Sequence, residues 1–570
     1  MIKKLLGSVR EYKKTSILCP IFVMLNVLVE SVIPLMMANL IDLGIDAGNM
    51  TYIIKIGLAL VIASACSLTF DIIAGRFAAT ASAGFAHNLR KDMFFNVQNF
   101  SFSNIDRFSS ASIVTRLTTD VTNVQNSYQM MIRMAVRSPI TLVFSMLMAF
   151  TINPQLALVF MACIPVLGVG LYLIMSKAFP TFKRVFKTYD KLNAVVGENL
   201  HGIRVVKSFV REDFEVEKFK NISEDLYRDY STAEKILSFN MPLMQFCVYT
   251  CMLLISWFGA RLIVSGNLTT GQLMSLITYA MHILMSLMML SMVFVMITMS
   301  RASAERIIEV LEERSDLTNC EEPITDVKNG DISFKNVSFS YSNDTNKLVL
   351  SDVNLDIKSG ETVGILGGTG SAKTTLVQLI PRLYDTTCGT LFVGGEDVRN
   401  YDINTLRSEV AMVLQKNILF SGTIKENLRW GNENATDEEL VRVCKLAQAD
   451  EFISKFPEGY DTHIEQGGTN VSGGQKQRLC IARALLKKPK ILILDDSTSA
   501  VDTQTDASIR KAFREEIPNT TKLIIAQRVS SIQDANKIVV LDNGKISAIG
   551  THDDLLKTCL LYTSASDTKW

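Results

Sequence analysis

The sequence predicts an α-helical domain with six membrane spans, followed by a soluble α/β domain. Long apolar runs fill the N-terminal half, whereas the C-terminal half alternates short β-rich runs with helical stretches. With 48% hydrophobic and only 20% charged residues, the chain is more apolar than most soluble proteins. We expect a transmembrane domain over residues 1–311, a polar linker over residues 312–328 and a soluble domain over residues 329–570.

Six apolar runs approach or exceed the length that a membrane span requires. A helix needs about 20 apolar residues to cross a hydrocarbon core of about 30 Å. We therefore predict a multi-pass protein embedded in the lipid bilayer. The six runs are Ile17–Leu40, Tyr52–Phe77, Met130–Ile152, Leu156–Met175, Leu243–Val264 and Leu273–Met299.

Basic residues predict the orientation of these spans. Lysine and arginine cluster before the first span and after the fourth, whereas the short connections Leu43–Ile54, Thr151–Gln155 and Val264–Gly271 contain none. Because cytosolic loops are enriched in these residues, both termini and the soluble domain are predicted to be cytosolic. The expected location is the plasma membrane, which in a bacterium is the inner, cytoplasmic membrane.

Two long inner connections, Gly84–Gln129 and Ala178–Ser238, carry charged residues among apolar ones at helical spacing. This pattern predicts that the spans continue as helices into the cytosol. The chain is expected to turn back at Phe102–Phe108 and around Glu198–Arg204. A short helix at such a turn would press against a soluble domain and carry motion to the membrane; the alternative is a solvated loop.

The strand-like run Thr362–Leu366 leads into a glycine-rich stretch, GILGGTGSAKTTL. Such a turn between a strand and a helix lets successive backbone N–H groups enclose phosphate oxygens. Lys373 would reach the outer phosphates and Thr374 would offer a hydroxyl to magnesium, so the motif predicts ATP and Mg²⁺ as ligands. The usual glycine before the lysine is Ala372 here, which is tolerable if its φ is negative. The expected nucleotide contacts are Gly367, Gly368, Thr369, Gly370, Ser371, Ala372, Lys373, Thr374 and Thr375.

Further motifs occur around this loop in a fixed order. Tyr341 in FSY precedes it, Gln415 follows it, and VSGGQ at Val471–Gln475 comes before the apolar run Ile491–Asp496. Together with the loop, this order resembles the nucleotide-binding domain of ABC transporters, an α/β P-loop domain. The six preceding spans with long inner helices resemble the ABC exporter half-transporters called type IV, and the resemblance covers nearly the whole chain.

The resemblance implies roles for these residues. Tyr341 would stack on adenine, the alternative being an ordinary strand tyrosine. Gln415 would contact Mg²⁺ and the γ-phosphate, and Asp495 would hold Mg²⁺ through water. A helix that begins at the signature would face a γ-phosphate bound by the opposite subunit, with Ser499–Asp502 along the same interface. These signature residues are Ser472, Gly473, Gly474 and Gln475.

Two catalytic positions depart from the family pattern. The family places glutamate after the magnesium aspartate and histidine in an IAHR-like turn, whereas this chain has Asp496 and Gln527. Aspartate is shorter by about one C–C bond, and a general base must lie within roughly 2.6 to 3.2 Å of the group that it deprotonates. Glutamine donates a hydrogen bond but carries no charge. Gln466, where the family often has an acidic residue, is a further departure. The expected catalytic residues are Gln415, Asp496 and Gln527. A site with these residues would bind ATP but hydrolyse it poorly.

An impaired catalytic set beside an intact signature predicts the degenerate-site subunit of a heterodimeric multidrug-type exporter. The partner would be a second ABC half-transporter, whose competent site this signature completes. The alternative is a homodimer that tolerates both departures. A lipid floppase and a nucleotide-gated, channel-like ATPase are the other functions that fit the pattern.

The expected substrate is a small hydrophobic or amphipathic compound. Glu30 and Asp71 are costly in lipid and are candidates for its pathway, although Asp71 could instead pair with Arg76; His282 is more typical of packing. A net charge of +1 argues against a nucleic-acid partner. The sixth span is rich in methionine, which suits a variable apolar ligand as well as helix packing. Its methionines are Met274, Met281, Met285, Met288, Met289, Met292, Met296 and Met299.

The last two predictions concern the cysteines and the C-terminal tail. The ten cysteines lack metal-ligand spacing and are expected to be reduced packing residues. The polar tail Leu560–Trp570 is predicted to be disordered.

Overall fold

The computed structural model describes residues 2–342, 344–497 and 500–567. It divides into two compact units, each of which is considered by itself. The first comprises Met1–Gln98 and Ser110–Glu313, and the second comprises Asn99–Ser109 and Arg314–Trp570. The short segment Asn99–Ser109 thus packs with the C-terminal unit.

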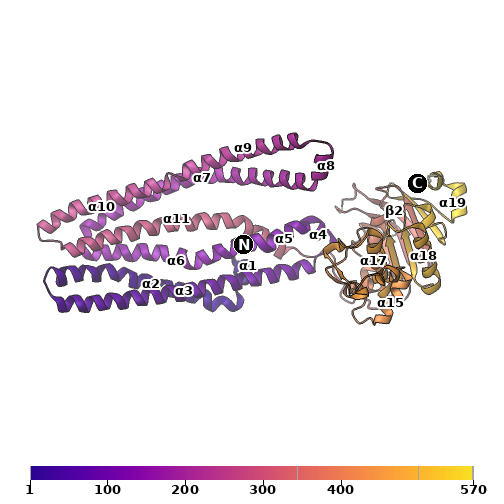
Figure 1. Ribbon diagram of the computed structural model, residues 1–570, viewed down its shortest axis with the longest axis horizontal. Coiled ribbons are helices and arrows are strands. Elements are labelled where there is room, and N and C mark those ends of the chain that lie inside the picture. The colour runs from indigo at the N-terminus through magenta and orange to yellow at the C-terminus, as the bar shows by residue number, and fades with distance from the viewer. Residues whose placement is uncertain (1, 343, 498–499, 568–570) are drawn as a thin grey trace. The chain divides into compact units, whose positions relative to one another are not determined.

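The first unit is a bundle of long helices (Figure 1). Among the described residues, six helical segments are long and apolar enough to cross a membrane, with mean hydropathies from 1.6 to 2.4, so the six predicted spans are confirmed. The helices of this unit are α1 (Ile2–Gly7), α2 (Lys13–Asn39), α3 (Met50–Gln98), α5 (Ser110–Thr115), α6 (Val121–Ile152), α7 (Pro154–His201), α8 (Ile203–Ser208), α9 (Glu212–Leu237), α10 (Asn240–Val264) and α11 (Thr270–Glu312).

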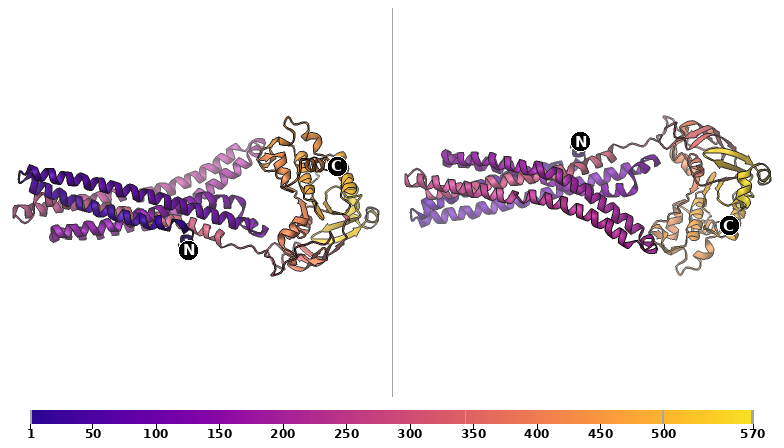
Figure 2. Two further views of the ribbon diagram at one scale, coloured as in Figure 1. Left: turned by 90° about the horizontal axis from the view of Figure 1, so that it is seen from below. Right: turned by 90° about the horizontal axis from the view of Figure 1, so that it is seen from above.

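Three of these helices extend far beyond a bilayer. α3, α7 and α11 contain 49, 48 and 43 residues, about twice the length that a span needs. The predicted continuation of the spans as helices is therefore confirmed. α7 and α9 run side by side and diverge from α3 at the end that carries α8 (Figures 1 and 2).

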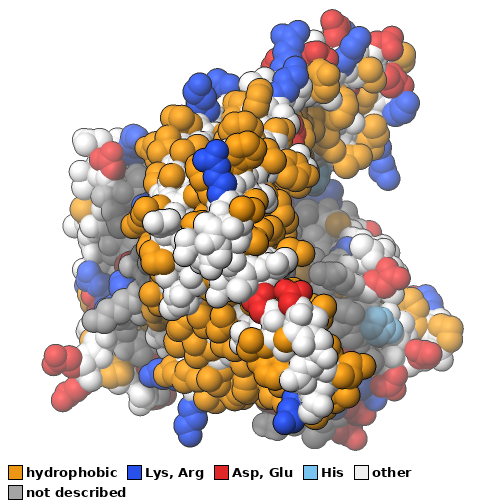
Figure 3. All heavy atoms as spheres, turned by 90° about the vertical axis from the view of Figure 1, so that its left-hand side faces the viewer, with side chains coloured by type: hydrophobic (Ala, Val, Ile, Leu, Met, Phe, Trp, Pro, Cys, Tyr) orange, Lys and Arg blue, Asp and Glu red, His pale blue; other side chains and the backbone are white. Residues whose placement is uncertain are grey.

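Local capping explains the short outer turns. Asn153 caps α7 with its side chain, and Pro154 follows at the first helical position, where a missing N–H costs nothing. Thr269 and Gln272 form a capping box at the start of α11. Seen towards these outer turns, the bundle presents mainly hydrophobic side chains, with few charges among them (Figure 3).

The second unit contains two main sheets. A four-stranded antiparallel sheet has the order β2-β1-β4-β5, and a six-stranded sheet has the order β12-β11-β3-β10-β9-β6. The strand-like run Thr362–Leu366 and most of the apolar run Ile491–Asp496 are found as strands. The strands are β1 (Ile332–Phe339), β2 (Leu350–Ile357), β3 (Thr362–Gly367), β4 (Cys388–Val393), β5 (Glu396–Asp397), β6 (Val410–Val413), β9 (Ile491–Asp495), β10 (Thr521–Ile525), β11 (Lys537–Asp542) and β12 (Lys545–Gly550), and β7 (Gly422–Thr423) pairs with β8 (His463–Ile464).

Side chains from the two faces of the six-stranded sheet enter different cores. Ile491 and Ile493 join one core together with α12, whereas Leu492 and Leu494 join another together with α17. Because successive strand residues point to opposite faces, α12 and α17 cover opposite faces of this sheet. The helices of this unit are α4 (Phe102–Phe108), α12 (Lys373–Gln378), α13 (Ile403–Glu409), α14 (Ile424–Arg429), α15 (Asp437–Leu446), α16 (Asp450–Ile453), α17 (Gly473–Leu486), α18 (Thr503–Glu516), α19 (His552–Thr558) and α20 (Leu560–Asp567).

Both predicted inner turns contain a short helix, α4 and α8, rather than a solvated loop. The prediction for the C-terminal tail was wrong over its described part, because α20 is helical. Tyr562 is fully buried there, and its hydroxyl lies 2.7 Å from Nδ1 of His552. Burial of this aromatic side chain, with a partner for its hydroxyl, stabilises the tail against the domain.

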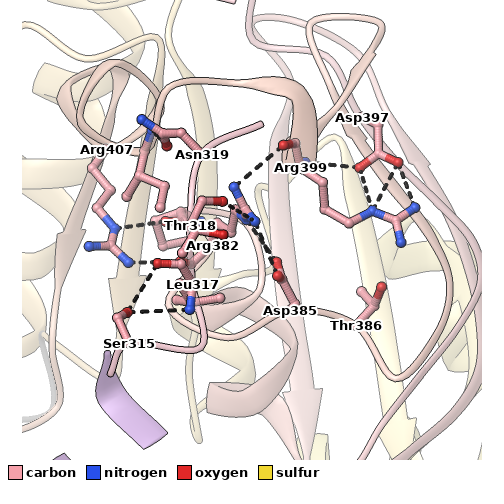
Figure 4. A network of polar contacts seen from close by, with 12 residues as sticks. Ser315, Leu317, Thr318, Asn319, Arg382, Asp385, Thr386, Asp397, Arg399 and Arg407 are labelled. Carbon is pink, nitrogen blue, oxygen red and sulfur yellow. Dashed lines mark hydrogen bonds and ion pairs between the residues drawn. The ribbon is translucent and has the colours of Figure 1, made fainter. Parts of the chain in front are cut away.

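The start of the second unit is fixed by a network of polar contacts (Figure 4). Arg382 is almost fully buried; it donates to the Thr318 carbonyl at 3.2 Å and forms an ion pair with Asp385 at 2.8 Å. Arg407 donates to the Arg382 carbonyl at 2.8 Å. The segment around Thr318, predicted from its polarity to be a linker, is thereby anchored along this unit.

Candidate nucleotide site

The candidate site lies at the carboxyl ends of parallel strands. β3, β10 and β9 are neighbours in the sheet, and Ile365, Ile525 and Asp495 lie in register across them. Chain segments that leave such strands together form the usual ligand-binding crevice of an open α/β sheet. The glycine-rich loop after β3, Asp496 after β9 and Gln527 after β10 therefore meet at one edge.

The glycine-rich loop has room for phosphate oxygens. An added Cβ at Gly368 or Gly370 would meet no heavy atom within 4 Å, and Gly370 has a φ of +83°. Lys373 Nζ donates to the carbonyls of Gly367 and Gly368, each at 2.8 Å. Burial lowers the pKa of Lys373, although Asp495 and Asp496 oppose that shift. An open loop with a half-buried cation at its base fits the terminal phosphates of a nucleotide.

Ala372 was expected to be tolerated if its φ is negative, and this condition is not met. Its φ is +70°, in the left-handed region, where a Cβ costs roughly 1–2 kcal/mol. Ala372→Gly is expected to stabilise the domain by about 0.5–1 kcal/mol, since relief of this strain outweighs the larger entropy of unfolded glycine.

Thermal unfolding of the purified chain measures this effect of Ala372→Gly. The matched control is Ala507→Gly at an exposed position in α18, where glycine should destabilise by about 1 kcal/mol. A loss of stability in both variants would show that Ala372 is not strained.

The two predicted oxygen ligands for a hard cation lie next to each other. Thr374 Oγ1 donates to Asp495 Oδ2 at 2.9 Å, and Asp495 is buried at the end of β9. Burial raises the pKa of Asp495, and the neighbouring Asp496 adds to the shift. Among the described residues, no three His, Cys, Asp or Glu side chains form a metal cluster. The pair fits Mg²⁺, which takes few protein oxygens and is shared with substrate phosphates, whose charge it would neutralise when bound.

The three candidate catalytic side chains meet at Asp496. Gln527 Nε2 donates to Asp496 Oδ2 at 2.9 Å, and the side chain of Gln415 also hydrogen-bonds to this carboxylate. Burial raises the pKa of Asp496, while these hydrogen bonds and Lys373 lower it. Asp496 has a φ of +49°, a conformation in which aspartate is several-fold enriched over most residues.

Tyr341 lies beside the helix that follows the glycine-rich loop. Its hydroxyl is 2.9 Å from Thr375 Oγ1, and its side chain is about half exposed, which leaves a ring face open to a base. Tyr384 packs edge-on against Tyr341 with ring centroids 5.2 Å apart, and its hydroxyl donates to Asp106 of α4 at 2.7 Å. α4 is thereby linked to the predicted adenine contact. No sequence pattern marks Tyr384 or Asp106, because their contact depends on tertiary packing.

The signature residues start α17. Ser472 caps this helix and forms a capping box with Gln475, whose side chain accepts from the Ser472 N–H at 2.9 Å. An added Cβ at Gly474 would lie 2.8 Å from the Ala500 carbonyl, so only glycine permits this close approach. Because α17 and α12 cover opposite faces of the sheet, the signature does not share a cluster with the chain's own phosphate loop. Ser499 lies outside the described residues.

In the first unit, the acidic residues of the spans have partners that the sequence analysis did not foresee. Arg133 Nη2 donates to both carboxylate oxygens of Asp71 at 3.1 Å. Arg137 Nη2 donates to both oxygens of Glu30, at 3.0 and 2.7 Å, and its Nη1 lies 3.5 Å from Asp71. Asp71 therefore pairs with two arginines of α6, and the suggested pairing with Arg76 is replaced. Charged groups within spans are expected to pair in this way.

Fold and site together define a multi-pass membrane protein with a P-loop nucleotide-binding domain. The family described as "ABC transporter transmembrane region" matches residues 16–303, and that described as "ABC transporter" matches residues 350–499. The Bacillus subtilis ABC transporter ATP-binding protein YfiB is 37% identical over 561 residues, 98% of this chain and 97% of the relative. The chain belongs to the ABC transporter family.

Two further similarities concern exporters and lipid transport. The ATP-dependent lipid A-core flippase of Desulfotalea psychrophila is 34% identical over 82% of each chain. The solved structure of a bacterial Atm1-family ABC exporter with ATP bound superposes with a TM-score of 0.83 at 24% identity, covering 98% of both chains. The fold of this chain is thus that of an ABC exporter with its membrane and ATPase domains in one polypeptide.

Proposed function

We propose that the chain is one subunit of a dimeric, ATP-driven exporter whose own nucleotide site binds ATP but hydrolyses it slowly. The state of Asp496 carries this proposal. Its carboxylate is one methylene shorter than that of glutamate, and the amides of Gln527 and Gln415 both hydrogen-bond to it. A short carboxylate held in this way is poorly placed to deprotonate a water positioned for a longer side chain.

The second part of the proposal is that the signature acts on nucleotide held by a partner half-transporter with a competent site. Its support is that the six-stranded sheet separates α17 from α12. The tip of the second inner turn gives further support, because Val205, Phe209 and Val210 expose apolar side chains there. An apolar tip of this kind is expected to be covered in the assembled exporter.

The proposed substrate is a small hydrophobic or amphipathic compound, moved as the dimer alternates between inward- and outward-facing states. Its polar end would meet the four-residue cluster of Glu30, Asp71, Arg133 and Arg137, whose side chains remain about one-third exposed. Its apolar part would lie along α11, where flexible thioethers accommodate variable shapes. Met281, Met285, Met289 and Met292 are exposed along one face of that helix.

Transport by the purified exporter in sealed vesicles tests this function. ATP-dependent movement of amphipathic dyes against a gradient is the expected result, and a nucleotide-gated channel would only dissipate the gradient. A lipid floppase is the second candidate, favoured by the similarity to the lipid A-core flippase. Movement of labelled lipids without movement of dyes would select the floppase and overturn the proposed substrate.

The polar cluster provides a specific variant for the transport assay. Arg137→Met leaves the Glu30 carboxylate without its arginine, so it is expected to reduce dye transport at least tenfold and to lower Tm. The double variant Arg137→Met with Glu30→Gln should regain Tm but not transport. The matched control is Arg76→Met, at an exposed arginine on the same helix as Asp71. Equal dye transport by all variants would show that the four-residue cluster is not part of the substrate pathway.

A further inference from the structure

A cavity of about 190 Å³ lies in the second unit at the amino ends of β3 and β10. This is the opposite edge of the sheet from the candidate nucleotide site, which lies at the carboxyl ends of the same strands. The C-terminal part of α18 and residues 531–536 complete its walls. None of the motifs considered so far contributes to it.

A buried lysine lines this cavity without a partner. Lys522, in β10, is 2% exposed, and among the described residues none forms an ion pair or a side-chain hydrogen bond with its ammonium group. Burial lowers the pKa of Lys522 to about 8, with no neighbouring charge contributing. A buried ammonium group is costly unless an anion compensates it. Lysine is almost never fully buried in folded domains unless it is paired.

The other charged groups of the cavity leave an excess of positive charge. Arg510 and Arg514 also line it, with Asp534 as the single acidic side chain. Arg510 Nη1 lies 3.0 Å from Asp534 Oδ2, and Arg514 Nη2 lies 3.7 Å from the same oxygen. Arg510 Nε also lies 3.3 Å from Oδ2 of Asp506. Lys522, Arg510 and Arg514 are thus set against the two carboxylates of Asp534 and Asp506, and within the described part of the chain Lys522 is the cation without a carboxylate partner.

We propose that this cavity is a binding site for a small oxyanion of the phosphate class. Lys522 would neutralise the anion from the floor of the cavity, while Arg510 and Arg514 would donate hydrogen bonds from the α18 wall. Guanidinium groups match the geometry of phosphate oxygens, and an ammonium group adds a point charge. Thr362, at the start of β3, also lines the cavity and is a further polar residue there.

The site is connected to both catalytic departures through covalent continuity. α18 follows the segment after Asp496, and residues 531–536 follow Gln527 on the same loop. Ser531 Oγ donates to Asp506 Oδ2 of α18 at 3.1 Å, which ties the two walls together. An anion that bridges Lys522 and α18 would therefore hold these segments in one arrangement, and its release would loosen them.

Thermal unfolding of the full chain in lipid nanodiscs, with inorganic phosphate as the probe, tests the proposal. Every protein also carries Lys373→Ala, which weakens phosphate binding at the nucleotide site, and sodium chloride of equal ionic strength serves as the salt control. Phosphate well above its Kd is expected to raise Tm by about 2–4 °C. Lys522→Met should abolish this gain while raising Tm without phosphate, because the uncompensated charge is gone.

The matched control is Lys511→Met, at an exposed lysine on α18 outside the cavity; it should respond to phosphate like its parent. Arg514→Gln, at the exposed rim, should at least halve the rise in Tm caused by phosphate. This variant replaces Lys522→Met in the test if Lys522→Met fails to fold. A gain in Tm that is equal in the parent and in the cavity variants would overturn the proposal. The absence of any phosphate effect in the parent would overturn it as well.

Discussion

Replacing Asp496 with glutamate is expected to raise the rate of ATP hydrolysis by the purified chain roughly 10²-fold, the lower end of what a positioned general base contributes. The longer side chain moves the carboxylate outward from the end of β9, beyond the amide of Gln527 that now holds it at 2.9 Å. Steady-state ATPase activity in lipid measures the effect. Asp496→Glu with Gln527→His should be more active still, because imidazole adds a charge that glutamine lacks.

The control for this substitution is Asp496→Asn, which keeps the length of the side chain and removes its charge; it should give no gain. Glutamate is less suited than aspartate to the φ of +49° at this position, so a small loss of Tm is expected in the glutamate variant. Unchanged hydrolysis in a folded Asp496→Glu protein would show that the length of this carboxylate does not limit the rate.

Ser472→Ala is expected to reduce ATP hydrolysis by the assembled two-subunit exporter about 10²-fold. The hydroxyl of Ser472 caps α17, and its removal withdraws a donor from the developing charge on a γ-phosphate, a change that typically costs 10² to 10³ in rate. Lys373→Ala in the same chain should cost much less, since in the proposed division of labour its phosphate loop belongs to the slow site. The comparison requires kcat of the complex with each variant.

Ser472→Thr is the matched control, because threonine keeps both the hydroxyl and the helix cap. It should retain most of the activity, which separates the loss of a donor from the loss of helix stability. If Lys373→Ala and Ser472→Ala reduce kcat equally, the two sites are equivalent, and the proposed division of labour between the subunits is incorrect.

Strands and spans were predictable because single local signals determine them. Ile491–Leu494 is apolar at every position, as in a strand buried on both faces, and α3 carries an apolar run longer than a bilayer. The tail was not predictable in this way, because the burial of Tyr562 depends on a contact with His552. Ala372 shows the same limit, since its sequence neighbours do not reveal that its φ is +70°.

The convergence of the candidate site residues was largely predictable, because their motifs follow strands whose carboxyl ends share one edge of the sheet. The residues missed were those that reach the site or the spans from other elements. Tyr384 and Asp106 meet only after α4 packs on the second unit. Arg133 and Arg137 lie near the start of the apolar run Met130–Ile152. Only the packing of α2, α3 and α6 brings them to Glu30 and Asp71.

The most direct test of the central claim is to follow ATP bound to the purified chain through a single turnover. Radiolabelled ATP and Mg²⁺ are added to excess protein in nanodiscs, and the bound nucleotide is separated into ATP and ADP over time. The account predicts that ATP binds and is recovered mostly intact, while the Asp496→Glu, Gln527→His double variant converts it to ADP at least 10²-fold faster. Conversion by the wild-type chain at the rate of the double variant would contradict it.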